Sequence, residues 1–147
     1  TAPTSSVFTV GVEIGINGNT NTYVAYLFRE IEGFSKFGVF TGNGNVDGPF
    51  IYTGFKPALF ISKSTSTTYD WTMWNNKANT YNPCTKRTMA NSTSAEIESS
   101  AEIDFLSNGV KIRNSSVARN ATGVAFIVMA FAENPFGGDG VAPATAR

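Results

Sequence analysis

The longest apolar run of the sequence is Val124-Ala125-Phe126-Ile127-Val128-Met129-Ala130-Phe131-Ala132. It is rich in β-branched and aromatic residues, and it lies between Gly123 and the polar stretch Glu133-Asn134-Pro135. The run is too short for a helix that spans a bilayer, which needs about 20 residues. It therefore predicts a β-strand, and no membrane insertion is expected.

Similar short runs recur along the chain, and helical periodicity is almost absent. The turn signals between them are Asn17-Gly18, Asn43-Gly44, Asp47-Gly48-Pro49 and Asn108-Gly109. The predicted strands are Val7–Val10, Tyr23–Ile31, Phe37–Thr41, Phe50–Thr53, Ala58–Ser62, Tyr69–Trp74, Ile103–Leu106, Val110–Arg113 and Val124–Ala132. Residues 94–101 admit either a short helical turn or a loop. Many short strands with frequent turns predict an all-β fold, a two-sheet antiparallel β-sandwich or jelly roll.

Composition and motifs argue against several classes of function. Eleven basic and eleven acidic residues give zero formal charge without a basic stripe, so nucleic acid is not an expected partner. The chain has no histidine and one cysteine, Cys84, which we interpret as a small buried or half-buried apolar residue. Motifs of the nucleophile-elbow, P-loop and zinc types do not occur. We expect no enzyme and no cofactor.

Paired carboxylates are the remaining catalytic possibility, because glycosidases use two of them at a defined separation. Glu30 and Glu32 would share one face of a strand, and so would Glu102 and Asp104. Charged side chains on strands ordinarily lie in solvent, so we expect solvated faces in place of a catalytic pair.

A partial internal repeat divides the chain. Tyr23–Glu30 parallels Phe126–Glu133, and Ser6–Val10 upstream parallels Asn108–Ile112. The repeat predicts that residues 1–35 are the closing strands of a preceding repeat or a strand-exchange extension, followed by a β-sandwich domain at 36–136. Residues 137–147 are expected to be a flexible or partner-bound tail. Two strands alone expose an edge and an apolar face, so the first part must pack on the next module, pair with another chain or belong to a preceding domain.

One group of residues suggests sugar binding. Strand alternation across Tyr69–Trp74 separates Trp71 from Trp74, so one tryptophan is expected in the core. A flat aromatic face with amide hydrogen bonds is typical of a carbohydrate platform. The candidate carbohydrate-binding residues are Trp74, Tyr81, Asn76 and Asn79. The alternative is that both tryptophans are buried between sheets or in a subunit interface.

A weak calcium candidate lies in the stretch Asn43-Gly44-Asn45-Val46-Asp47-Gly48, where Asn43, Asn45 and Asp47 are oxygen donors at alternate positions. Gly54 stands where a calcium loop has its bidentate glutamate, and one donor alone is charged. A tight Asn/Gly turn between two strands explains the pattern better, so no metal is predicted.

Four stretches together resemble a repeat domain of marine and aquatic bacteriophage tail-fibre-like structural proteins. They are Glu32–Gly44, Asp47–Ala58, Ile103–Gly109 and Met129–Phe136. The resemblance implies a concanavalin- or laminin-G-like β-sandwich, often present in tandem, in which the first strands of this chain close a preceding repeat. It offers no catalytic residues.

The leading hypothesis is therefore a non-enzymatic virion structural protein, a tail-fibre-like module for assembly and host-surface attachment. Its expected partners are other copies of itself, other virion proteins and a host-surface glycan, and its expected location is the surface of the virion. The alternatives are a lectin-like carbohydrate-binding module and a capsid decoration protein.

Overall fold

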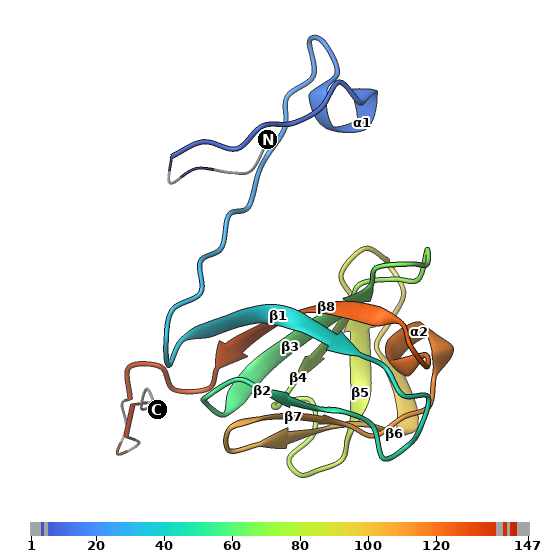
Figure 1. Ribbon diagram of the computed structural model, residues 1–147. Helices are drawn as coiled ribbons and strands as arrows, with labels where there is room; N and C mark the ends of the chain where they lie inside the picture. Colours follow the sequence, from blue (N-terminus) through green and yellow to red (C-terminus); the bar gives the residue numbers. More distant parts are fainter. Residues whose placement is uncertain (1–3, 5, 138–139, 141, 144–147) are drawn as a thin grey trace.

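The protein consists of an extended N-terminal arm and a β-domain, as the computed structural model shows (Figure 1). The structure describes residues 4, 6–137, 140 and 142–143. The helical turns are α1 (Ile14–Asn17) and α2 (Val117–Asn120). The strands are β1 (Ser35–Thr41), β2 (Phe50–Tyr52), β3 (Pro57–Ser64), β4 (Thr72–Asn75), β5 (Cys84–Met89), β6 (Ile97–Leu106), β7 (Gly109–Ile112) and β8 (Ala125–Ala132).

All eight strands belong to one antiparallel sheet in the order β1-β8-β3-β4-β5-β6-β7-β2. The all-β prediction is confirmed. The division into two separate sheets is not confirmed, because β5 joins the two halves of the sheet. Its residues Thr88 and Met89 pair with β4, whereas Cys84, Lys86 and Arg87 pair with β6 across an irregularity after Cys84. The sheet curls so that β1 and β2, its two edge strands, line one groove.

The core forms inside this curled sheet through the two-residue alternation of its strands. In β8 the even-numbered residues Phe126, Val128 and Ala130 are buried, while the residues between them are half-buried on the outer face. Phe126 stacks on Phe40 of β1 with ring centroids 5.0 Å apart. Burial of such side chains stabilises the fold by about 1.5–3 kcal/mol each. The core residues are Phe40, Ile51, Phe55, Phe60, Trp74, Cys84, Ile103, Phe105, Val110, Ile112, Phe126, Val128 and Ala130.

The arm contains no strand among its described residues, so the predicted strands Val7–Val10 and Tyr23–Ile31 are absent. Without a neighbouring strand, their backbone groups have no ladder to join. The arm meets the domain at the turn Ile31–Ser35, where the Ser35 Oγ donates a hydrogen bond to the Arg29 carbonyl (2.7 Å). Phe28 packs there against Phe131 at a centroid distance of 5.8 Å.

β6 is longer than the strand predicted for this part of the chain. β6 begins at Ile97 and runs to Leu106, so most of residues 94–101, which admitted a helical turn, is strand. No helix in the described part of the chain is long and apolar enough to cross a membrane.

Candidate functional site

A pocket of about 320 Å³ opens at the end of the sheet where β3 begins and β8 ends. This volume lies at the lower end of the range of small-ligand sites. The loop between β4 and β5 forms much of its wall. The lining residues are Lys56, Asn76, Lys77, Asn79, Thr80, Tyr81, Asn82, Cys84, Phe105 and Glu133.

Asparagine side chains fix the β4–β5 loop. The Asn75 Oδ1 accepts hydrogen bonds from the backbone amides of Lys77 (3.0 Å) and Ala78 (2.8 Å). Asn82 exchanges two hydrogen bonds of 2.9 Å with the backbone of Phe105 in β6, as a residue in a neighbouring strand would. Such side-chain mimicry of backbone turns lets a loop keep one conformation. The pocket wall is therefore preformed.

Charge in the pocket centres on Glu133, whose side chain is largely buried. Its two carboxylate oxygens pair with Lys56 Nζ (2.7 Å) and Lys77 Nζ (3.0 Å). Hydrogen bonds from Lys56 and then from Lys77 hold the pKa of Glu133 below its ordinary value. The carboxylate therefore stays ionised at neutral pH and holds both ammonium groups.

Two groups of the pocket wall, one buried and one exposed, are candidates for contact with a ligand. The Asn76 Oδ1 is buried and has no hydrogen-bond partner among the described residues. The ring of Tyr81 is 79% exposed. An unpaired amide acceptor in the same pocket as an exposed aromatic face is a combination that can contact a sugar.

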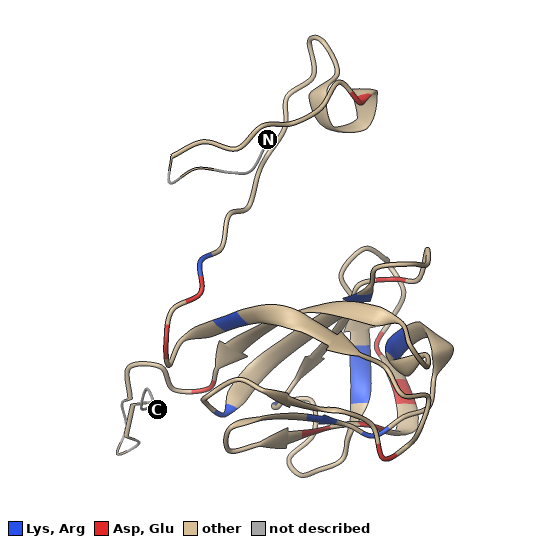
Figure 2. Cartoon of the chain, viewed as in Figure 1, with Lys and Arg blue, Asp and Glu red and all other residues tan. Residues whose placement is uncertain are grey.

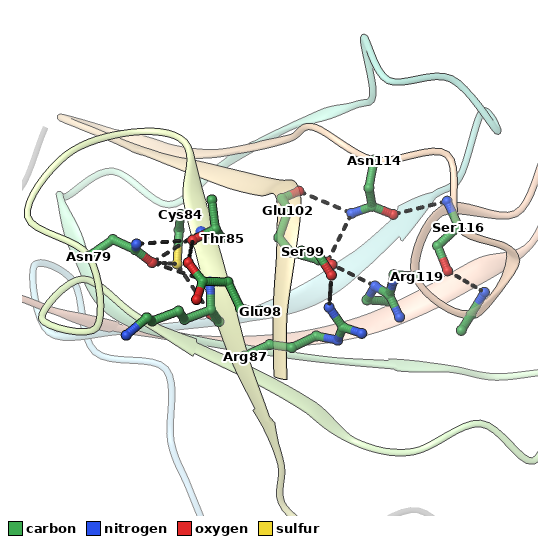
Figure 3. Close-up of polar contacts among 12 residues, drawn as sticks. Asn79, Cys84, Thr85, Arg87, Glu98, Ser99, Glu102, Asn114, Ser116 and Arg119 are labelled. Atoms are coloured by element: carbon green, nitrogen blue, oxygen red, sulfur yellow. Dashed lines mark hydrogen bonds and ion pairs between the residues drawn. The ribbon is translucent and has the colours of Figure 1, made fainter. Parts of the chain in front are cut away.

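Of the residues predicted for a sugar platform, Tyr81, Asn76 and Asn79 line this pocket, and Trp74 does not. Trp74 is 1% exposed, because the face of β4 that it shares with Thr72 points into the core, where it contacts Phe60. Asn79 lines the pocket, but its amide serves the loop. The Asn79 Oδ1 accepts from the backbone amides of Thr85 (3.0 Å) and Lys86 (3.2 Å) (Figure 3).

Sequence reasoning missed Lys56, Lys77 and Glu133. Lys56 and Glu133 flank Pro57 and Ala132, which are paired in the sheet, so strand pairing brings the two charges together. The one signal of Lys56 and Glu133 in the sequence is that each is a charged residue within two positions of the end of a predicted strand.

A second polar cluster is buried where residues of β5, β6 and α2 meet (Figure 3). Glu102 is 1% exposed and is paired with Arg87 and, at 2.9 Å, with Arg119 Nε. Its backbone carbonyl accepts from Asn114 Nδ2 (3.0 Å). Burial lowers the pKa of Arg119, and the charge of Glu102 opposes that shift. The prediction of a solvated face was wrong for Glu102, since two guanidiniums replace water around its carboxylate.

Two other sequence interpretations concern Cys84 and the Asn/Gly turn. Cys84 is a free, buried thiol, as predicted, and burial raises its pKa. In the turn between β1 and β2, the Asn43 Oδ1 accepts from the Asn45 amide and the Asn45 Oδ1 from the Asp47 amide. Asp47 pairs with Lys111 at 2.7 Å. These oxygens serve the turn itself, so the turn interpretation is confirmed.

The arm is a third candidate, as an interaction surface. Its charges are confined to Glu13 and the group near its base, Arg29, Glu30 and Glu32, and the rest is uncharged (Figure 2). Its exposed large apolar residues are Val7, Phe8, Val10, Val12, Ile14, Ile16, Tyr23, Val24, Tyr26, Leu27, Phe28 and Ile31. Apolar surface on this scale makes the arm a candidate for contact with another molecule.

Comparison with known proteins gives one match. The family model described as "Domain of unknown function (DUF7483)" matches residues 1–135, so it includes the arm together with the β-domain. No curated protein and no solved structure matches.

Proposed function

The chain belongs to the DUF7483 family, and we propose that it is a non-enzymatic structural module that assembles with further copies of itself on the surface of a virion. The proposed role is that of a tail-fibre-like module for assembly and host-surface attachment. A capsid decoration protein would have the same fold and would differ in the virion protein to which it docks.

The observation that carries the proposal is the arm. Val12 is 95% exposed, Tyr26 82% and Val24 76%, although such residues are ordinarily buried. Burying one of them stabilises an assembly by about 1.5–3 kcal/mol before the entropy of association is subtracted. A chain that presents a row of them favours association with another molecule.

The virion part of the proposal is supported by the resemblance of residues 32–44, 47–58, 103–109 and 129–136 to phage tail-fibre-like repeats. The non-enzymatic part is supported by the state of two carboxylates. Glu133 is ionised between two ammonium groups, and Glu102 is buried between two guanidinium groups. Both are positioned to hold structure together and not to transfer protons.

Light scattering on the full chain and on a variant that begins at residue 32 tests the proposal. We expect the full chain to form oligomers at micromolar concentration and the truncated chain to be a monomer with an intact β-domain. No described core residue lies in the removed segment, so the domain should keep its fold. A full chain that stays monomeric at all concentrations would contradict the proposal.

Glycan binding in the pocket is the second candidate function, and the unpartnered Asn76 Oδ1 beside Tyr81 favours it. Binding to bacterial surface polysaccharides, measured by calorimetry and on glycan arrays, should weaken about tenfold in Tyr81→Ala and in Asn76→Ala, the scale of one lost stacking or hydrogen-bonding contact. Tyr69→Ala is the matched control, because Tyr69 is an exposed tyrosine outside the pocket. Equal loss in all three variants, or no binding by the native chain, would exclude this function.

A further inference from the structure

The sheet has an open seam between β1 and β2, the strands at the two ends of its strand order. Each is paired on one side, β1 with β8 and β2 with β7, so each has one edge of unpaired backbone groups. Open edges readily accept a further strand. A groove of about 210 Å³ lies between the two strands and is lined by residues of both.

The walls of the seam are apolar and exposed. Val39 of β1 is 62% exposed, and Phe50 and Tyr52 of β2 are 45% and 53% exposed. An inserted strand would cover these side chains and would also satisfy the backbone groups of both edges. The seam therefore fits an apolar strand that needs partners on both sides.

The arm contains such a strand-forming segment, Thr22–Phe28. Apolar side chains project from both of its faces, since Val24, Tyr26 and Leu27 are each more than 70% exposed. No backbone hydrogen bond joins this segment to any other described residue. Apart from the contacts of Phe28 with the domain, the segment is exposed and belongs to no sheet.

The internal repeat indicates which strand pairing the arm segment favours. Tyr23–Glu30 parallels Phe126–Glu133, and most of that second copy is β8. β8 is paired on both sides, with β1 and with β3. The arm copy has the same order of apolar residues followed by an acid, and neither of its edges is paired.

We infer that Thr22–Phe28 of one copy inserts between β1 and β2 of a second copy and closes its seam. This inference rests on the proposed function and names the surface through which assembly occurs. The partner is a second copy because, beyond the turn Ile31–Ser35 and the contact of Phe28 with Phe131, the arm runs away from its own domain (Figure 1). The same sequence thus contains the inserted segment and the seam that accepts it. Contact between two copies would pair the backbone groups of both and cover their apolar side chains.

Proline substitutions in the arm test the insertion through its backbone. Consecutive amides of a strand point to opposite edges, and proline removes the amide proton. Ala25→Pro and Tyr26→Pro should each raise the dissociation constant of the oligomer about tenfold or more, measured by light scattering and sedimentation. Thr9→Pro is the arm control and should leave assembly unchanged, because Thr9 is an exposed polar residue outside Thr22–Phe28. If one of the two prolines has no effect, the strand is paired on one edge, and insertion between β1 and β2 is overturned.

A substitution in the seam tests the acceptor. Val39→Asp should weaken assembly about tenfold or more, because a charge would then be buried under the inserted strand. Val46→Asp is the matched control, since Val46 is also 62% exposed but lies outside the groove. Both positions are exposed in the single chain, so the fold should tolerate both changes. Equal effects of the two variants would overturn the seam as the docking site.

Hydrogen exchange of the full chain separates this inference from the broader proposal. The amides of Thr22–Phe28 and the amides at the open edges of β1 and β2 should become protected as the oligomer forms and should exchange freely in the diluted monomer, whereas the amides paired with β8 and β7 should be protected in both states. An oligomer that forms without this protection overturns the inference but leaves assembly through the arm in place. A permanent monomer overturns both, and protection within a monomer would show that the segment pairs with its own domain.

Discussion

At the scale of single residues, we expect the loss of one partner in the buried cluster around Glu102 to be costly. Glu102→Gln removes the charge that Arg87 and Arg119 share and leaves two guanidiniums facing a neutral amide. Losing one partner of a buried ion pair costs about 3–5 kcal/mol, so the free energy of unfolding in urea should fall by this amount.

Glu96→Gln is the matched control for that measurement. Glu96 pairs with Lys86 at 3.4 Å, and both side chains are more than a third exposed. Exposed pairs contribute about 0–1 kcal/mol, so this variant should unfold almost as the native chain does. Equal losses in the two variants would show that the Glu102 cluster is not the stronger interaction.

Glu133 predicts a dependence of stability on pH. Hydrogen bonds from Lys56 and Lys77 lower its pKa in the folded protein, so the ionised carboxylate stabilises the fold above its ordinary pKa of 4.5. That contribution is lost as the pH falls below 4.5 and through the lowered pKa of the folded state. Glu133→Gln should therefore melt at a lower temperature than the native chain at neutral pH.

The difference in melting temperature between the two proteins should shrink as the solution is acidified below pH 4.5. Calorimetry across that range checks the sign. A difference that stays constant with pH would mean that the substitution acts through packing and not through the charge of Glu133.

At the scale of elements, Asn120 joins α2 to the turn between β1 and β2. It is fully buried, and its Nδ2 donates to the Asn45 carbonyl (2.8 Å) and the Asn114 carbonyl (2.7 Å), while its Oδ1 accepts from the Asn43 amide (3.0 Å). Asn120→Ala removes these three hydrogen bonds and leaves the carbonyl of the buried Asn114 unpaired, which should cost about 2–4 kcal/mol in denaturant unfolding.

Asn91→Ala is the control for this element. The Asn91 Oδ1 also accepts a hydrogen bond from a backbone amide, that of Trp71 at 2.9 Å, but Asn91 is exposed. Water can replace the lost bond there, so the change should be within about 1 kcal/mol. A comparable loss at Asn91 would contradict the special role of the buried amide.

Sequence patterns predicted the strands whose side chains alternate or form apolar runs. β3 and β8 were found because one face of each fills the core, as Phe60 and Phe126 do. β5 was missed because Cys84–Met89 contains two basic residues and no clear alternation. Its place in the sheet depends on contacts with β4 and β6 that are distant in sequence. Tyr23–Ile31 has a strand composition but forms no strand, because composition does not supply a partner.

The candidate site shows the same division. Asn76, Asn79 and Tyr81 meet because they occupy one loop, and the sequence places them together. Lys56 and Glu133 meet through the pairing of β3 with β8, which a single sequence does not reveal. Trp74 was assigned to the wrong face because alternation separates two faces without telling which one is buried.

At the scale of the whole molecule, association should stabilise the β-domain. A partner that binds the folded state raises the melting temperature in proportion to the logarithm of its concentration. We therefore expect the melting temperature of the full chain to rise on concentration, and that of the chain beginning at residue 32 to stay constant. Differential scanning fluorimetry over a hundredfold range of concentration is a sufficient measurement. A constant melting temperature for the full chain would indicate that association of the arm does not change the stability of the β-domain.

The short tether at the base of the arm limits how an assembly can be built. Residues 29–34 lie between Phe28 and β1, and even a fully extended chain of this length reaches only about 20 Å. The turn Ile31–Ser35 shortens that reach further. Copies linked in this way would touch one another directly, so a row of them would behave as a stiff rod with an axial repeat close to the width of one domain, and not as beads on a loose string.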